Sequence, residues 1–164
     1  MFERIVCATD FSDTAEVAWQ LAVELARAHQ AELVLVHVFI ELPIYSEVAV
    51  SSLQQVWEEQ RLWAEQQLAE RVEAAAGRGL AVRYLLRTGT AAEEIAQTAT
   101  DEHADLVVVG THGRTGLNRL MIGSVAERVV RVAPCPVLTV KPHRVREAAR
   151  AAAVARPDPL EQRG

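Results

Sequence analysis

The segment best suited to chemistry is a glycine-rich stretch, GTHGRTGLNRLMIGS, that occupies residues 110–124. It follows an apolar, strand-like run and leads into a helical pattern. Glycines let the main chain approach a ligand closely, and a helix N-terminus offers free N–H groups and a positive dipole end to phosphate oxygens. Ser124 is expected to cap this helix and to offer its hydroxyl to a phosphate. One glycine pair would indicate only a turn, but several glycines followed by Gly123 and Ser124 favour phosphate binding.

Five short apolar runs alternate with helical patterns and must position this loop. The predicted strands are residues 5–9, 33–39, 81–87, 106–110 and 136–140. The predicted helices run from about 13 to 30, from 51 or 52 to 77, from 90 to 102, and from 124 to 132. Strands that alternate with helices pair in parallel through right-handed crossovers. We therefore predict an α/β fold, an open five-stranded parallel sheet with helices on both faces.

Two strands have predicted places in this sheet. Residues 106–110 are the most uniformly apolar run and are expected to be central. Pro136 cannot donate a ladder hydrogen bond, so the last strand belongs at an edge. An uncovered apolar edge invites pairing, and a second copy of the chain is the simplest cover. Ligands of such sheets bind beyond the carboxyl ends of the strands, where the strand order reverses.

The glycine spacing fits a known pattern, G-x2-G-x9-G-[S/T], at Gly110, Gly113, Gly123 and Ser124. On this motif the chain resembles the universal stress protein family, in its ATP-binding subgroup. The resemblance covers residues 2 to about 141 and includes four further segments. They are IVCATDFS at 5–12, LVLVHV at 33–38, DLVVVG at 105–110 and CPVLTV at 135–140. It implies a Rossmann-like sheet of order 3-2-1-4-5 within a nucleotide-binding domain at residues 1–142.

The resemblance also implies a ligand, ATP or else ADP or AMP, together with Mg²⁺. Asp10 would accept hydrogen bonds from the ribose hydroxyls or help hold the nucleotide-bound metal, and Val38 would pair its main chain with the adenine edge. Gly110 and Gly113 would surround the ribose and α-phosphate. The β- and γ-phosphates would be held by Gly123, Ser124 and Val125. The implied contacts are Thr9, Asp10, Val38, Val109, Gly110, Gly113, Arg114, Gly123, Ser124 and Val125.

Several of these residues have simpler interpretations. Asp10 would also serve as a cap for the following turn, and Val38 is ordinary core unless its main chain is unpaired. His112 is more typical of a bystander than of a catalytic base. Arg114 would neutralise the charge of a triphosphate, or else be a solvated loop charge. His37 is expected to make a local hydrogen bond at a strand end. The tryptophans lie on helical patterns and are expected to pack: Trp19, Trp57 and Trp63.

The residues argue against three other α/β classes. Lys141 is the only lysine, so the P-loop pattern with its phosphate-binding lysine is absent. Ala8 to Asp10 occupy the place where a dinucleotide fingerprint needs glycines. A phospho-receiver domain would want an aspartate where the chain has Arg87 and Thr88. No catalytic residue is assigned.

Charge and composition suggest where the chain acts. The net charge of −5 disfavours nucleic acid, and no apolar run approaches the roughly 20 residues of a membrane span. We expect a cytoplasmic protein with no membrane partner, and buried, reduced thiols at Cys7 and Cys135. Residues 143–164 form a basic, Ala- and Arg-rich extension, expected to be a solvated tail or to contact an acidic partner or a neighbouring subunit.

The leading functional hypothesis is an ATP-binding stress-response regulator that acts as a homodimer through the edge strand Pro136 to Val140. Two alternatives stay open. One is a slow ATP hydrolase, since fast phosphoryl transfer asks for a positioned base and charge-neutralising groups that the sequence does not clearly supply. The other is a structural dimer with an unoccupied crevice.

Overall fold

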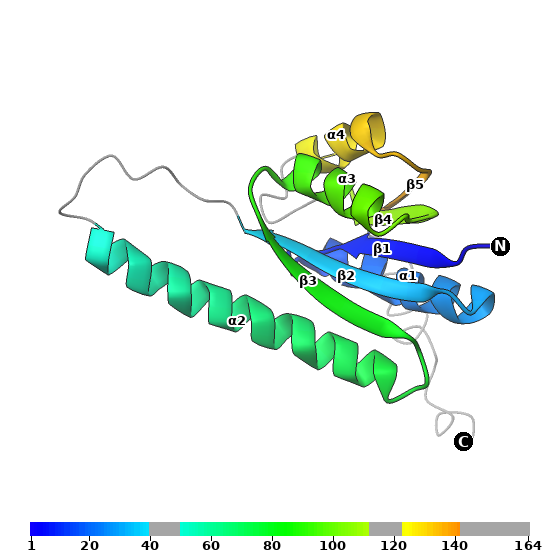
Figure 1. Ribbon diagram of the computed structural model, residues 1–164, viewed down its shortest axis with the longest axis horizontal. Helices are drawn as coiled ribbons and strands as arrows, with labels where there is room; N and C mark the ends of the chain where they lie inside the picture. The colour runs from blue at the N-terminus through cyan, green and yellow to red at the C-terminus, as the bar shows by residue number, and fades with distance from the viewer. Residues whose placement is uncertain (40–49, 112–122, 142–164) are drawn as a thin grey trace, which may run out of the picture.

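The computed structural model describes residues 1–39, 50–111 and 123–141, apart from the side chains of residues 50–53 (Figure 1). The strands are β1 (Arg4–Ala8), β2 (Glu32–Phe39), β3 (Val82–Thr88), β4 (Leu106–Gly110) and β5 (Val137–Val140). The helices are α1 (Asp13–His29), α2 (Val50–Ala76), α3 (Ala91–Asp101) and α4 (Ser124–Val132). Several predictions lie outside the described residues: those on His112, Gly113 and Arg114, and that of the extension at 143–164.

The five strands form one parallel sheet in the order β3-β2-β1-β4-β5. The predicted fold class and strand order are therefore confirmed, and β5 lies at an edge as Pro136 suggested. The prediction that residues 106–110 form the central strand is wrong. β1 is central, and β4 lies between β1 and β5. Both are inner strands with a run of four buried residues, so hydropathy does not decide which is central, and the direction of the crossovers decides.

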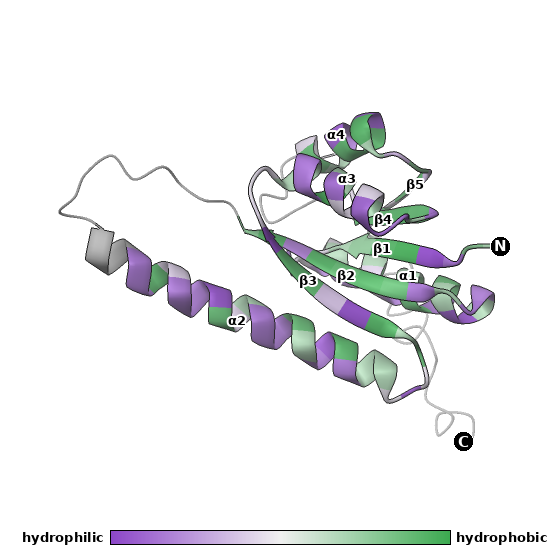
Figure 2. Cartoon of the chain, in the orientation of Figure 1, coloured by the Kyte–Doolittle hydropathy of each residue, from purple (hydrophilic) through white to green (hydrophobic). Residues whose placement is uncertain are grey.

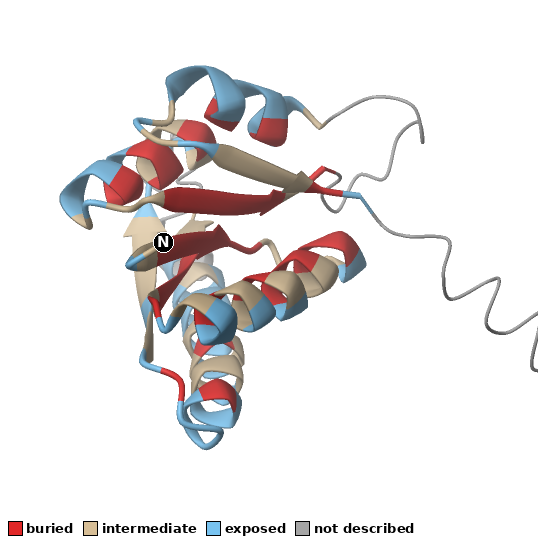
Figure 3. Cartoon of the chain, turned by 90° about the vertical axis from the view of Figure 1, so that its right-hand side faces the viewer, coloured by how far each residue is buried: buried red, intermediate tan, exposed pale blue. Residues whose placement is uncertain are grey.

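Helices cover both faces of the sheet because side chains on each strand alternate between two cores. Ile5 and Cys7 pack with α1 and α2, whereas Val6 and Ala8 pack with α3 and α4. Figure 1 shows these helix pairs on opposite sides of the strands, and Figure 3 shows the buried residues gathered on the strands and inner helix faces. In Figure 2 the strands are mostly hydrophobic, while α2, which extends well beyond the sheet, carries many hydrophilic residues. In the described parts of the chain, no helix has the length and apolar character to cross a membrane.

Local signals place the helix starts to within a residue or two. Ser12 is the N-cap of α1, and its side chain accepts from Ala15 N. Thr90 is the N-cap of α3 but makes no side-chain cap bond. Gly89 precedes it with a φ of 143°, a conformation that favours glycine.

Both cysteines are free thiols, but their surroundings differ. Cys7 is fully buried in the central strand, and burial raises the pKa of its thiol. Cys135 is only half-buried, so the prediction of a buried thiol is wrong for this residue. It precedes the edge strand β5, where neighbouring chain covers one side only. Partial burial, followed by the nearby Asp105 carboxylate, raises the pKa of Cys135 as well.

An ion-pair network joins the amino ends of the strands, opposite the edge where ligands of such folds bind. Glu32 on β2 pairs with Arg4 on β1 at 2.9 Å and with Arg83 on β3 at 2.8 Å. Arg83 also pairs with Glu102, just after α3. The hydrogen bond from Arg83, with further contributions from Arg4, lowers the pKa of Glu32.

We predict that Glu32→Gln makes the protein less stable at neutral pH and less sensitive to acid. Because the folded-state pKa of Glu32 lies below its ordinary value of 4.5, its stabilisation is complete above that value and disappears as the pH falls through the lowered pKa. The side chain is 30% exposed, so we expect a loss of about 1 kcal/mol or less at pH 7. Urea unfolding at pH 7 and pH 3 measures both effects.

Glu24→Gln, an exposed position on α1, is the matched control and should leave the unfolding midpoint nearly unchanged. An equal loss for Glu32→Gln at both pH values would contradict this account of the network.

Candidate functional site

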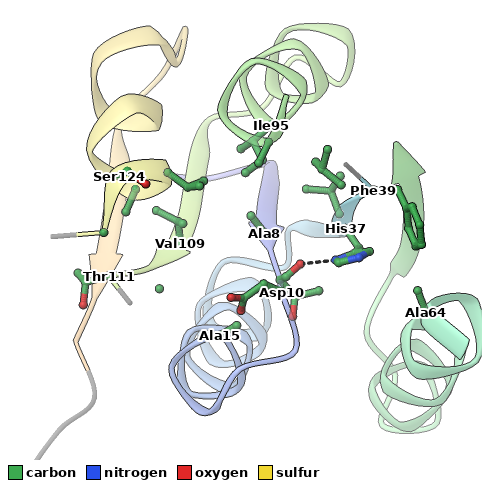
Figure 4. Close-up of a pocket in the computed structure, with 18 of the residues that line it drawn as sticks. Ala8, Asp10, Ala15, His37, Phe39, Ala64, Ile95, Val109, Thr111 and Ser124 are labelled. Carbon is green, nitrogen blue, oxygen red and sulfur yellow. Dashed lines mark hydrogen bonds between the residues drawn. The ribbon is translucent and has the colours of Figure 1, made fainter. Parts of the chain in front are cut away.

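A cavity of about 580 Å³ opens at the carboxyl ends of β1, β2 and β4 (Figure 4). This volume lies within the range of small-molecule sites. The cavity is where the strand order reverses, because β2 and β4 flank β1 on opposite sides. Eight of the ten predicted site residues line it: Thr9, Asp10, Val38, Val109, Gly110, Gly123, Ser124 and Val125.

The start of α4 forms one end of the cavity. Gly123 is the N-cap with no side-chain cap bond, and its own N–H donates to Thr111 O at 2.6 Å. Ser124 is the first helical residue, so the prediction that Ser124 caps the helix is wrong; glycine holds that position and has no side chain to offer. The first turn lines the cavity with Ser124, Val125 and Ala126, and among the described residues no side-chain cap bond from the N-cap position competes for its N–H groups. This is an arrangement suited to an anion.

The turn between β1 and α1 brings a carboxylate to the cavity. Asp10 Oδ1 accepts from Ser12 N at 3.1 Å, and Thr9 Oγ1 accepts from Phe11 N at 3.0 Å. The turn-capping role considered for Asp10 is thus present. Because Asp10 also lines the cavity, the cap orients its carboxylate toward the site as well.

The main chain of Val38 faces the cavity. Main-chain groups of a parallel strand bond alternately to its two neighbours. On β2, Val36 O accepts from Thr9 N on the β1 side, and Phe39 O accepts from Gly89 N on the β3 side, both at 2.9 Å. The N–H and C=O of Val38 therefore face the β1 side, where β1 has already ended at Ala8. They form a donor and acceptor pair at the cavity wall.

His37 helps to end the ladder at this point. Its Nδ1 lies 2.8 Å from Thr9 O, the carbonyl that would otherwise continue toward Val38 (Figure 4). A carbonyl only accepts, so Nδ1 carries the proton and donates. The predicted hydrogen bond of His37 exists, but its partner lies 28 residues away and is not local.

Gly110 has a structural role in addition to lining the cavity. A Cβ built on it would lie 3.0 Å from Thr14 Cγ2 and 3.2 Å from Ala15 N. The missing side chain thus lets the end of β4 approach the first turn of α1. The glycine is required by this packing, whether or not a ligand approaches as well.

Sequence reasoning missed the part of the wall that comes from α2 and α3. Trp63, expected to pack, lines the cavity and is 45% exposed, whereas Trp19 is 6% exposed and is a packing residue as predicted. Trp57 lines a smaller hollow of about 290 Å³ beside β3. No spacing signal identifies Trp63, because only tertiary packing brings α2 to the site. The other missed wall residues from these helices are Gln60, Ala64, Ala91 and Ile95.

The described residues offer little to hold a metal by themselves. Among them, no group of three or more His, Cys, Asp or Glu side chains could hold an ion. Asp10 is the one carboxylate on the described wall of the cavity. A metal here would need further oxygen ligands, as the phosphates of a nucleotide supply.

We predict that Gly110→Ala destabilises the protein by about 1–3 kcal/mol, because the new methyl group overpacks the contact between β4 and α1. Gly77→Ala is the control, since its Cβ would meet only Glu73 O, at 3.3 Å. Urea unfolding compares the two variants. If Gly110→Ala is as stable as the wild type, the contact has more room than these distances imply.

In both sequence and fold, the chain is similar to universal stress proteins. The sequence profile of the universal stress protein family matches residues 1–141. A universal stress protein of Thermus aquaticus is 39% identical over 144 residues, which cover 86% of this chain and all of the relative. The solved structure of one from Methanocaldococcus jannaschii has a TM-score of 0.77 at 30% identity, covering 87% of this chain and 98% of its own.

A further solved structure is a universal stress protein in complex with cAMP. It has a TM-score of 0.61 at 25% identity, and the match covers 85% of this chain and 96% of that one.

Proposed function

Because this chain belongs to the universal stress protein family, we propose that it binds an adenine nucleotide, ATP above all, in the cavity beside α4. The observation that carries the proposal is the uncapped first turn of α4, which lines the cavity with N–H groups next to Gly123. A relative of the same fold binds cAMP, a ligand with the same adenosine and phosphate components. We expect the protein to act in the cytoplasm, as a regulator of the stress response.

The proposed pose spans the cavity from α4 to β2. The terminal phosphates lie at Ser124 and Val125, where the helix dipole and the Ser124 hydroxyl stabilise their charge. The ribose lies beside Asp10, with Val109 and Gly110 below it. Mg²⁺ joins the phosphate oxygens near the Asp10 carboxylate, and Gly113 and Arg114 complete the predicted contacts. The main-chain N–H and C=O of Val38 pair with the adenine edge.

The described wall favours holding a nucleotide over consuming it rapidly. It is largely apolar, and Asp10 and His37 are its described titratable groups. Asp10 caps a turn, and His37 Nδ1 is engaged by Thr9 O. Rapid phosphoryl transfer depends on groups placed to neutralise charge and position the nucleophile, so we assign the site to binding and regulation.

We predict that Gly123→Val combined with Ser124→Val lowers the affinity for MgATP at least about 100-fold, because branched side chains obstruct the helix start and the hydroxyl is lost. Ser124→Ala alone should cost about 5- to 10-fold, in keeping with the loss of one hydrogen bond worth about 1 kcal/mol. Isothermal titration calorimetry with ATP and Mg²⁺ measures both. Glu24→Gln, an exposed position on α1 outside the cavity, should bind as the wild type does. Unchanged affinity in the double variant would contradict the proposal.

We further propose that the chain forms a homodimer through β5. Val107 N donates to Pro136 O at 3.0 Å, and Thr111 N donates to Val140 O at 2.8 Å. By the alternation along a strand, the main-chain groups of Val137 and Thr139 face the open edge. Val130 and Val132 of the neighbouring α4 are 51% and 43% exposed and add apolar surface. The same helix thus starts at the nucleotide site and ends beside the proposed interface.

We predict that Thr139→Pro converts the dimer to a monomer, because proline removes an N–H that faces the open edge and is not needed by β4. Thr139→Val keeps that N–H and is the control. Multi-angle light scattering should give twice the 18.0 kDa chain mass for the wild type and the control. A monomeric wild type, or a Thr139→Pro variant that stays dimeric, would exclude this interface.

A further inference from the structure

We propose that Trp63 is the surface on which the base of the nucleotide stacks, and that Phe11 is a positioning residue that holds the Trp63 ring in place. This inference rests on the proposed function, since it names a further contact in the same cavity. It concerns a helix, α2, that the glycine motif does not include.

Trp63 has the location that a base-stacking residue needs. It lines the cavity together with Ala64 of the same helix, at the end where β2 supplies Val38 and Phe39. Figure 4 shows Ala64, His37 and Phe39 on the side of the site away from Ser124 and Thr111. Phosphates bound at α4 therefore leave the base on the side of Trp63.

The exposure of Trp63 distinguishes it from a core residue. A large aromatic side chain that is 45% exposed gives up hydrophobic stabilisation unless a ligand or partner covers it. The described residues around it on the cavity wall are largely apolar, and a flat aromatic ring among them suits a nucleobase. Every nucleobase has a π-face that stacks on an aromatic side chain, so such a contact adds affinity without selecting the base.

Phe11 supports the Trp63 ring from the turn between β1 and α1. The two rings meet edge to face, with centroids 5.0 Å apart and an interplanar angle of 77°. The Phe11 ring also lies 4.6 Å from the His37 ring, and the Arg71 guanidinium lies 5.4 Å from its centroid. These contacts surround Phe11 from β2 and from α2.

The main chain at Phe11 is strained in a way that fits this role. Its φ of 64° is in the left-handed region, which bulky residues rarely adopt. Such a conformation persists only where the surroundings hold it, and it is concentrated at functional sites. Phe11 lies between Asp10 and Ser12 in the turn from β1 to α1, and this conformation of its main chain directs the phenyl ring toward Trp63.

An ion pair links α2 to α1 at Arg71, which follows Trp63 on α2. Arg71 Nε lies 3.1 Å from Glu16 Oε2, and Arg71 stands over Phe11 at the same time. The helix that carries Trp63 is therefore tied to the helix that follows the Asp10 turn. The ring is thus held in place before a ligand arrives, which reduces the entropy lost on binding.

The first experiment measures MgATP affinity by calorimetry for Trp63→Ala, Trp63→Phe and Trp57→Ala. Loss of a base–aromatic stack should weaken binding about 5- to 100-fold in Trp63→Ala. Trp63→Phe keeps an aromatic face and should bind within about threefold of the wild type. Trp57→Ala alters the same residue type on the same helix, outside the main cavity, and should bind as the wild type does.

Tryptophan fluorescence supplies a second readout. ATP should quench the emission of the wild type and of Trp57→Phe, and it should leave the emission of Trp63→Phe nearly unchanged. Wild-type affinity in Trp63→Ala, or a quench that persists in Trp63→Phe, would overturn the stacking role.

A double-mutant cycle tests Phe11. Phe11→Leu should weaken MgATP binding in the wild-type background and add almost nothing in Trp63→Ala, because it acts through that ring. An equal loss in both backgrounds would show that Phe11 does not act by positioning Trp63.

The outcomes separate this inference from the proposed function. A wild type that binds no ATP defeats both. If Gly123→Val with Ser124→Val abolishes binding while Trp63→Ala does not weaken it, the nucleotide site stands and the stacking role alone is wrong.

Discussion

The uncapped amino end of α4 is the feature on which the rest of this site depends. A helix start needs partners for its first N–H groups, and here the N-cap is a glycine that has no side chain to supply one. This helix start lines a cavity whose other walls come from β1, β2, β4, α2 and α3. An anion at this point would accept from N–H groups that the N-cap glycine has no side chain to satisfy, which is why the phosphate end of the proposed ligand belongs there.

The remaining parts of the site hold that end at a fixed distance from an apolar wall. Gly110 lets β4 approach α1, so the strand that leads toward α4 is packed against the helix that follows Asp10. The His37 bond to Thr9 O ends the ladder of β1 and β2 and leaves the Val38 main chain facing the cavity. Packing at one point and a hydrogen bond at the other therefore set the span between the proposed phosphate and base positions.

Most of the fold followed from periodicity and turn residues. Continuous apolar runs with helical patterns between them give parallel strands, and Pro136 places the last strand at an edge. The errors have local causes. Hydropathy could not separate β1 from β4, since both are buried on two faces. The apolar neighbours of Cys135 predict a buried thiol, but they do not show that the residue lies beside an edge strand, where it is only half-buried. Ser124 was assigned the cap that Gly123 occupies, since composition does not fix a helix start to one residue.

The sequence by itself determined the strand–helix alternation, the parallel sheet and the glycine-bearing approach to α4, because these depend on residues close together in the chain. It also indicated Asp10 and Val38, because they lie in segments that resemble those of the universal stress protein family. Only the tertiary structure decided that Trp63 and Phe11 meet at the cavity and that the Val38 main chain is turned toward it. Those facts depend on how α2 packs on β2 and β3 and on where β1 ends beside β2, and no spacing along the chain encodes either.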